Sequence, residues 1–196
     1  MVQDPSSWGR LADYIHDVVG YFANDERILM WDLYNEPGNN GLGDESLGLV
    51  QSAFQWAREA DAQQPLSVGV WFDNPVLSDY QLQASDIITF HNYNDTASLE
   101  GQIADLKMHG RPLLCTEYMA RTRGSRFETH LPVFKRERVG CINWGLVSGK
   151  TQTIYQWGVP GGEKEPEVWF HDIFRTDGTS YDEAEVRFIR EITGAG

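Results

Sequence analysis

Five short apolar segments alternate with longer segments of helical periodicity along this chain of 196 residues. Each apolar segment has the length and composition of a buried strand. Parallel strands need crossovers long enough to hold a helix, so the alternation predicts an α/β fold built from parallel βαβ units. The five predicted strands cover residues 27–34, 66–72, 86–93, 112–118 and 140–147.

The segments between these strands are predicted to be helices. Residues 8–22 carry apolar side chains at positions that recur with helical spacing. Ser125 with Glu128, and Ser180 with Glu183, have the spacing of a capping box, which predicts helices that begin beside them. These two helices are predicted to cover residues 127–138 and 181–192, and two further helices are predicted at residues 47–62 and 99–109.

The whole chain, residues 1–196, is predicted to form one domain. Its length suits a single core, and 41% of its residues are apolar, which is enough to build one. Residues 148–178 are rich in Gly and Pro and contain Trp157 and Trp169. We interpret this stretch as a functional loop rather than a linker.

Four of the five predicted strands have polar side chains at their carboxyl ends. In parallel β/α folds ligands bind at this end of the sheet, so these side chains are expected to converge on one site. They are Asn35 and Glu36 at the end of the first strand, His91 and Tyr93 at that of the third, Glu117 and Tyr118 at that of the fourth, and Asn143 and Trp144 at that of the fifth.

Two of these residues, Glu36 and Glu117, are carboxylates on separate strands. Either one alone is as readily an ordinary loop charge or a helix cap. Together, flanked by aromatic and amide side chains, they indicate the carboxylate pair that cleavage of a glycosidic bond needs. One carboxyl group protonates the leaving oxygen while the other attacks the anomeric carbon.

The motifs around these residues resemble those of clan A glycoside hydrolases, most closely the family 5 cellulases and xylanases. WDLYNEP, residues 31–37, is similar to the Asn-Glu-Pro signature on the fourth strand of that barrel. LLCTEY, residues 113–118, resembles the seventh strand, which bears the nucleophile. HNY, residues 91–93, resembles the sixth-strand His-x-Tyr, and NWG, residues 143–145, resembles the eighth-strand segment with a substrate-stacking Trp.

The four motifs occur in the family's order, and the resemblance implies both a fold and an activity. The fold would be a partial TIM β/α barrel that holds the fourth to eighth βα units, with about five parallel strands. The activity would be hydrolysis of β-1,4-linked polysaccharides or oligosaccharides such as cellulose, xylan or mannan. The family's first three units, which supply an Arg and a His beside the nucleophile, have no counterpart in this sequence.

The resemblance also implies roles for the carboxylates and their neighbours. Glu36 would be the general acid/base and Glu117 the nucleophile. Asn35 would bind the sugar 2-hydroxyl group, and Tyr93 would hold Glu117 in its ionised form. Retention of configuration would require the two carboxyl groups to lie about 5 to 5.5 Å apart.

The remaining candidate residues are expected to contact the substrate. By the resemblance, His91 would line the subsite of the cleaved sugar and Trp144 would form its floor. The alternatives are a core histidine and a structural ring. Trp71 and Trp157 are candidate rings for stacking on a sugar, and a role in packing is an equal alternative for both.

Composition argues against several other classes of function. The 29 acidic and 16 basic residues give a formal net charge of -13, which repels phosphate backbones and anionic membranes. The five histidines are scattered without ligand spacing, so no metal and no cofactor is expected. No G-x-S-x-G occurs, which leaves a promiscuous esterase as the weakest alternative.

Cys115 and Cys141 are interpreted as reduced core thiols in preference to a disulfide.

A partial barrel would leave strand edges and apolar surface uncovered. We expect another copy of the chain to cover them, with a symmetric dimer favoured, or the missing half of the barrel in a longer protein. The amino terminus lacks the basic and apolar regions of a signal peptide, which predicts a cytoplasmic location. The second hypothesis for function is a carbohydrate-binding or assembly module derived from such a hydrolase, with turnover impaired.

Overall fold

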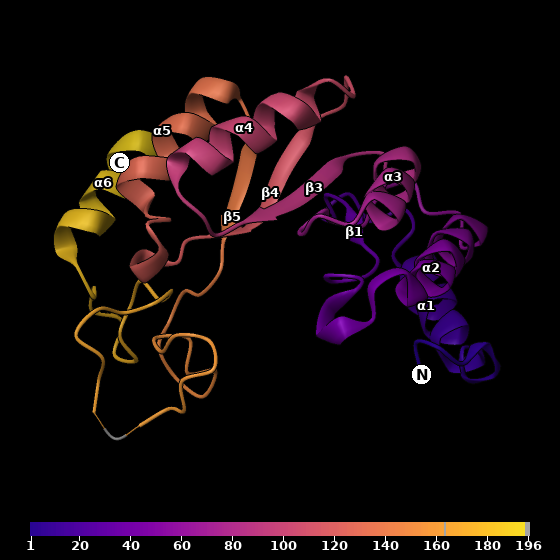
Figure 1. Cartoon of the computed structure of the whole chain (residues 1–196), viewed down its shortest axis with the longest axis horizontal. Helices are drawn as coiled ribbons and strands as arrows, with labels where there is room; N and C mark the ends of the chain where they lie inside the picture. Colours follow the sequence, from indigo (N-terminus) through magenta and orange to yellow (C-terminus); the bar gives the residue numbers. More distant parts are fainter. Residues whose placement is uncertain (163, 195–196) are drawn as a thin grey trace. The chain divides into compact units, whose positions relative to one another are not determined.

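The structure is a computed structural model that describes residues 1–162 and 164–194 (Figure 1). Along this part of the chain six α-helices alternate with five β-strands, and the strands form a two-stranded and a three-stranded sheet. The predicted α/β class is therefore confirmed. The chain forms two compact units, one of Met1–Phe90 with His109–Pro112 and the other of His91–Met108 with Leu113–Gly196.

The first unit combines a short parallel sheet with three helices. β1 pairs with β2, with Trp31 opposite Leu66, and further along the chain Val70 forms a parallel bridge with Phe90. Helices α1 and α2 pack against each other. The elements are α1 (Gly9–Tyr21), β1 (Trp31–Asp32), α2 (Leu47–Glu59), β2 (Leu66–Ser67) and α3 (Pro75–Ala84).

The core of this unit lies between α2 and β2. Val50, Phe54 and Ala57 recur on one face of α2 at intervals of four and three residues, so all three point in the same direction. They pack with Leu66 and Val68, and all five side chains are buried. Removal of this much apolar surface from water is the main force that holds a helix on a sheet.

The second strand, β2, is much shorter than the predicted strand at residues 66–72. Side chains beyond the strand bind the backbone groups that would otherwise extend its ladder. Ser85 Oγ accepts a hydrogen bond from Val68 N at 3.3 Å, and Gln81 Nε2 donates to Gly69 O at 2.6 Å. Buried backbone groups need partners but not necessarily another strand, so an apolar run alone predicts burial and not the extent of the ladder.

Helix α3 was not among the predicted helices. Its start has a clear local cause, because Asn74 Oδ1 accepts a hydrogen bond from Leu77 N at 3.2 Å and Pro75 occupies the first turn. Leu77 is fully buried and anchors the helix. The amphipathic pattern of α3 is weak, which is why periodicity alone does not reveal this helix.

The second unit contains a sheet in the order β3-β4-β5, with the boundary between the units inside β3. Figure 1 shows α5 lying between α4 and α6. Helix α5 packs on both of these helices and on β5, and α4 packs on β4. The elements are β3 (Ile88–Asn92), α4 (Thr96–Lys107), β4 (Leu113–Tyr118), α5 (Phe127–Glu137), β5 (Gly140–Asn143) and α6 (Glu183–Thr193).

An irregularity in β4 determines which side chains face the helices. β4 and β5 run parallel, and their register shifts between Cys115 and Tyr118. Both residues are buried, whereas Thr116 and Glu117 between them are only partly buried. In a regular strand Glu117 would share the face of Cys115, because side chains alternate. The extra residue of the bulge keeps Glu117 off that apolar face.

Tyr118 does not join the predicted cluster of polar side chains at the strand ends. The bulge turns it toward α5, where its ring lies edge-on to Phe127 and Phe134 and stacks on His130. Tyr118 is 2% exposed. The prediction that Tyr118 joins these side chains is therefore wrong, because its aromatic ring packs in the apolar core of the second unit.

Neither predicted capping box forms. Ser125 Oγ instead accepts a hydrogen bond from Met119 N at 3.1 Å, and α5 begins after Arg126 without a side-chain cap. Helix α6 is capped by Asp182, whose Oδ1 accepts from the backbone N–H groups of the first turn, rather than by Ser180. A carboxylate satisfies these N–H groups and also interacts favourably with the helix dipole, so Asp182 is the better cap.

Arg121 connects three separate segments of the second unit. Its side chain is 3% exposed and forms a salt bridge with Glu185 of α6, with Nη2 and Oε1 2.5 Å apart. Arg121 also donates to Trp169 O at 3.1 Å and to Asp172 O at 2.9 Å. A buried guanidinium needs both a counter-ion and acceptors. These contacts therefore fix the chain between Trp169 and Asp172 against the loop that follows β4 and contains Arg121.

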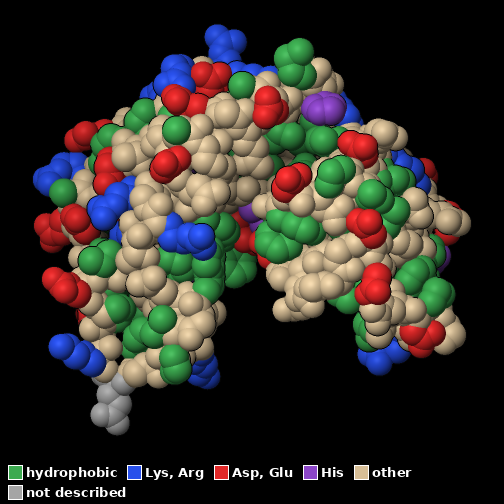
Figure 2. All heavy atoms as spheres, in the orientation of Figure 1, with side chains coloured by type: hydrophobic (Ala, Val, Ile, Leu, Met, Phe, Trp, Pro, Cys, Tyr) green, Lys and Arg blue, Asp and Glu red, His purple; other side chains and the backbone are tan. Residues whose placement is uncertain are grey.

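Acidic and basic side chains are interspersed on the face of the molecule seen in Figure 2. On the helices of the second unit, Arg136 pairs with Glu100 at 2.6 Å and with Glu137 at 2.9 Å. Exposed pairs of this kind contribute little to stability, because water and salt screen them. Cys115 and Cys141 lie opposite each other on β4 and β5, and both are free thiols. Within residues 1–162 and 164–194, no helix has the length and apolar character to span a membrane.

His130 makes the stability of the second unit depend on pH. Its Nε2 lies 3.0 Å from Asn94 O and its Nδ1 lies 2.8 Å from Thr129 Oγ1, which satisfies a neutral ring. Burial lowers the pKa of His130 below 6.5, the value expected for the unfolded chain. Below about pH 6.5 the unfolded state therefore binds more protons than the folded state, and the free energy of unfolding falls as the pH falls.

We expect His130→Phe to reduce this dependence. Urea titrations between pH 7.5 and 5.5 give the slope of the unfolding free energy against pH. The slopes of the wild type and the variant should differ by an amount that approaches about 1.4 kcal/mol per pH unit, the limit for one proton. His109→Gln, which replaces an exposed histidine, is the matched control for the loss of one histidine. An unchanged slope in His130→Phe would contradict the assignment.

Candidate active site

In the first unit, Glu36 lies in a tight turn that follows β1. Glu36 has a φ of 47° and Gly38 a φ of 85°, so both adopt left-handed conformations. Asn39 Nδ2 donates to Glu36 Oε2 at 2.8 Å, and Asn39 N donates to Glu36 O at 3.2 Å. A left-handed glutamate costs about 1–2 kcal/mol, and such strain is common at functional sites. Asn35, which precedes this turn, is exposed.

Trp71 supports the turn that carries Glu36. Its Nε1 donates to Pro37 O at 2.9 Å, and its ring packs on Phe72 with the centroids 4.6 Å apart. The Phe72 ring fills the space next to Gly38, where an added Cβ would lie 2.6 Å from a ring carbon. Trp71 thus has a structural role in the first unit, and its use as a sugar platform stays a prediction.

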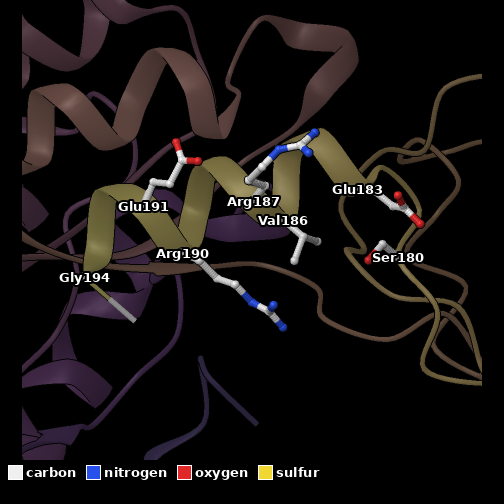
Figure 3. A pocket seen from close by; sticks show the side chains of 7 residues that line it. All are labelled: Ser180, Glu183, Val186, Arg187, Arg190, Glu191 and Gly194. Carbon is white, nitrogen blue, oxygen red and sulfur yellow. The ribbon is translucent and has the colours of Figure 1, made fainter. Parts of the chain in front are cut away.

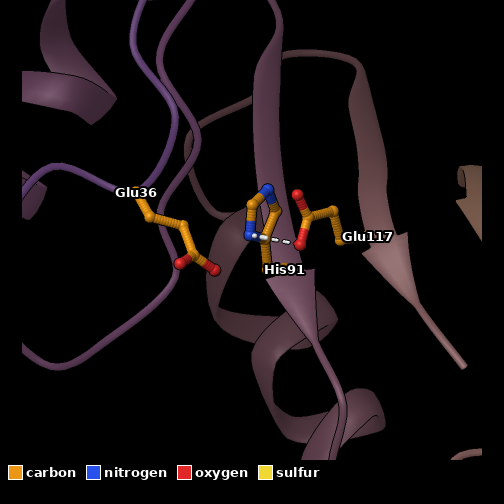
Figure 4. Close-up of side chains that lie close together, drawn as sticks. All are labelled: Glu36, His91 and Glu117. Atoms are coloured by element: carbon orange, nitrogen blue, oxygen red, sulfur yellow. Dashed lines mark ion pairs between the residues drawn. The ribbon is translucent and has the colours of Figure 1, made fainter. Parts of the chain in front are cut away.

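In the second unit, β3 and β4 bring His91, Tyr93 and Glu117 together. Tyr93 Oη donates a hydrogen bond to Glu117 Oε2 at 2.7 Å. His91 Nδ1 lies 3.4 Å from the same oxygen, as the dashed line in Figure 4 shows. The Glu117 side chain is 12% exposed and that of His91 is 5% exposed. A buried carboxylate that accepts a phenol hydrogen bond is held in one orientation.

Trp157 belongs to the same cluster in the second unit. Its ring lies edge-on to Tyr93 at 4.8 Å and to Phe170 at 4.8 Å, and the Arg123 guanidinium lies 5.4 Å from its centre. Despite these contacts, half of Trp157 remains exposed. An indole that is held by several neighbours and still presents open surface is suited to stacking on a sugar ring.

His171 is a member of this cluster that the sequence analysis did not single out. Its ring centroid lies 5.7 Å from that of Tyr93 and 5.4 Å from that of Trp157. Its Nδ1 lies 2.6 Å from Met119 O, two residues after Glu117. The residue follows no strand and belongs to no recognisable motif, so only the structure reveals it.

Trp144 lies at the end of β5 and is 43% exposed. Its backbone N donates to Tyr118 O at 3.0 Å, which continues the pairing of β5 with β4. The following turn is fixed by Asn143, whose Nδ2 donates to Gly145 O at 2.6 Å. Trp144 therefore presents an open ring at the carboxyl end of its strand, as predicted, and its contact with substrate stays a prediction.

A hollow of about 610 Å³ lies along α6, apart from the carboxylates described above (Figure 3). Its walls come largely from one helix and present charged side chains, including Glu183, Arg187, Arg190 and Glu191. A sugar site usually combines aromatic surface with a few converging polar groups. The hollow has no aromatic lining, which favours the cluster around Glu117 as the functional site.

Comparison with known proteins identifies a family for most of the chain. The model of the cellulase family, glycosyl hydrolase family 5, matches residues 4–150. No curated protein sequence matches the chain.

Solved structures show the same fold. The chain matches xylanase 10B from Thermotoga maritima with a TM-score of 0.61 and 20% identity, over 94% of this chain and 65% of the other. A Gloeophyllum trabeum endo-β-1,4-xylanase of glycoside hydrolase family 10 matches with 0.59 and 16%, over 94% and 67%. Faecalibacterium prausnitzii β-glucuronidase matches with 0.61 and 14%, over 94% and 35%. The chain thus spans about one third to two thirds of these proteins, and it has the fold of part of a β/α barrel.

Gly145 tests how closely the turn after β5 must approach His171. Gly145 has a φ of 84°, and an added Cβ would lie 2.7 Å from His171 Cβ and 2.9 Å from Asp172 Oδ1. Gly145→Ala should therefore lower the free energy of unfolding by about 2–4 kcal/mol in urea titrations. Gly149→Ala is the control, because nothing lies within 4 Å of its Cβ position. Equal free energies of unfolding for the two variants would show that the short distance between Gly145 and His171 does not limit the side chain at position 145.

Proposed function

Because the chain belongs to the cellulase family, glycosyl hydrolase family 5, we propose that it cleaves β-1,4-linked polysaccharides or oligosaccharides, such as cellulose, xylan or mannan, with retention of configuration. The observation that carries the proposal is the environment of the Glu117 carboxylate, namely its burial and its contacts. Its carboxylate is largely buried, accepts a hydrogen bond from Tyr93 and lies next to His91. These contacts suit a nucleophile that must be ionised and fixed in direction.

In the proposed mechanism Glu117 attacks the anomeric carbon and forms a glycosyl-enzyme, while Glu36 protonates the departing oxygen. Glu36 then removes a proton from the water that releases the sugar. Asn35 binds the sugar 2-hydroxyl group, an interaction that strengthens in the oxocarbenium-like transition state. The strained turn at Glu36 supports this role, because it limits the directions in which the side chain extends.

The aromatic residues are proposed to bind the sugar chain. Trp144 and Trp157 both present open rings in the second unit, and Trp157 lies against Tyr93. Stacking on the apolar face of a sugar orients the glycosidic bond, and orientation supplies a large part of catalysis. His91 lines the subsite of the cleaved sugar, and Trp71 is proposed to contact the substrate at the edge of the Glu36 turn.

Substitution of the two glutamates tests the proposal. We expect Glu117→Gln to lower kcat on aryl β-cellobiosides and xylobiosides by about 10³-fold or more. Glu36→Gln should lose activity on natural polysaccharides but cleave substrates with a good leaving group, because these need no proton. Proton NMR of the first product should show the β anomer.

The control is Glu26→Gln, an exposed carboxylate of the first unit, which should retain wild-type kinetics. Activity that survives in Glu117→Gln would exclude this residue as the nucleophile. A wild-type chain that binds oligosaccharides in calorimetry but does not cleave them would favour the second candidate, an impaired carbohydrate-binding or assembly module.

We further propose that the chain self-associates through the edge of β5. Among the residues that the structure describes, β5 pairs in its sheet with β4, and Ile142 on this strand is about half exposed. Leu146 and Val147 in the segment after β5 are also about half exposed, although Val147 forms a bridge with Phe174. Exposed apolar side chains along a strand edge favour pairing with another chain. Sedimentation velocity at micromolar concentration should show a dimer that Ile142→Lys weakens, whereas a wild-type monomer would count against this prediction.

A further inference from the structure

Met119 lies two residues after Glu117 and adopts a strained conformation. Its φ is 81°, in the left-handed region that a methionine rarely occupies. Such a residue costs about 1–3 kcal/mol and persists only where its surroundings hold it. Two side chains do so here, because Ser125 Oγ accepts from Met119 N at 3.1 Å and His171 Nδ1 lies 2.6 Å from Met119 O.

The contact with Met119 defines the protonation state of His171. A carbonyl oxygen only accepts hydrogen bonds, so the proton must reside on His171 Nδ1. Nε2 is buried and has no hydrogen-bond partner among residues 1–162 and 164–194. A second proton there would bury an unsatisfied N–H group, which is costly. Burial correspondingly lowers the pKa of His171, so the ring is neutral at neutral pH.

The neutral ring also packs on the groups that surround the nucleophile. Its centroid lies 5.7 Å from that of Tyr93, which donates to Glu117, and 5.4 Å from that of Trp157. The backbone of His171 also forms a hydrogen bond, because its N donates at 3.1 Å to the carbonyl oxygen of Thr153, on the segment that leads to Trp157. One residue therefore contacts the loop after Glu117, the tyrosine on its carboxylate and the exposed indole.

We propose that His171 is a positioning residue for Glu117, which acts by donating its Nδ1 proton to Met119 O and by supporting Tyr93 and Trp157. This inference rests on the proposed role of Glu117 as nucleophile. A phenylalanine would fill the same space but could not hold the Met119 carbonyl. The imidazole thus links the strained turn to the hydrogen bond between Tyr93 and Glu117.

Two amide substitutions separate this role from simple packing. The amide nitrogen of Asn can take the place of imidazole Nδ1, whereas that of Gln reaches the position of Nε2. We expect His171→Asn to keep kcat within about threefold of wild type. His171→Gln and His171→Phe should lower kcat by about 10–100-fold, with KM changed less than threefold, because a nucleophile displaced by about 1 Å loses rate more than affinity.

Crystal structures of the variants give a readout that does not need activity. The distance from Tyr93 Oη to Glu117 Oε2 should stay near 2.7 Å in His171→Asn and exceed about 3.5 Å, the limit of a hydrogen bond, in His171→Gln. An unchanged distance in His171→Gln would overturn the inference, as would equal kcat in the Asn and Gln variants. An inactive wild-type chain with the expected change in distance would refute only the proposed hydrolysis.

Nitrogen-15 NMR of the wild-type chain covers the case in which the variants do not fold. The His171 resonances should show a protonated Nδ1 and a bare Nε2 at pH 7.5, consistent with the 2.6 Å contact to Met119 O. A proton found on Nε2 instead would mean that Met119 O has no donor in this ring, and the proposal would fail.

Discussion

The buried guanidinium of Arg121 is the interaction on which the second unit depends most. Helix α6 buries no residue completely, so apolar packing alone fixes it weakly. The salt bridge to Glu185 attaches this helix, and the bonds to Trp169 O and Asp172 O attach the chain between them. Loss of one partner from such a network typically costs about 3–5 kcal/mol, because the remaining charge is left buried. The position of His171 follows directly from these contacts.

The bulge in β4 connects the core to the carboxylate chemistry. A strand that delivers a catalytic side chain must also bury its other face, and strict alternation would put Cys115 and Glu117 on the same face. The register shift lets Cys115 and Tyr118 face the helices while Glu117 points elsewhere. The strain at Met119 lies just beyond this shift. The two irregularities thus occur next to Glu117, the proposed nucleophile, and bulges and strained residues are common near active sites.

The order of strands and helices was predictable from the sequence because burial leaves a periodic pattern. All five strands lie within the predicted segments, although Tyr118 at the end of β4 packs in the core instead of joining the polar side chains. The pattern could not predict where a ladder stops, since Ser85 and Gln81 satisfy the backbone beyond β2. It also could not predict Asp182 as the cap of α6, because Ser180 matched the capping-box spacing. His171 and Arg121 escaped notice because their roles arise from contacts over about fifty residues, which no local motif encodes.

The match to the family ends at residue 150, yet two members of the Glu117 cluster lie beyond it. Trp157 and His171 come from the segment between β5 and α6, and they touch Tyr93 directly. Glu117, the proposed nucleophile, and its hydrogen-bond donor Tyr93 belong to the part that matches the family, whereas the exposed indole of Trp157 belongs to the part outside the match. The segment after residue 150 therefore contacts the surroundings of Glu117 through His171 and presents an open aromatic surface through Trp157. Substitution of Trp157 should change which sugar binds best without removing the capacity to cleave it, whereas substitution of His171 should act on Glu117, since the surfaces that select a ligand are separable from the groups that fix a reacting side chain.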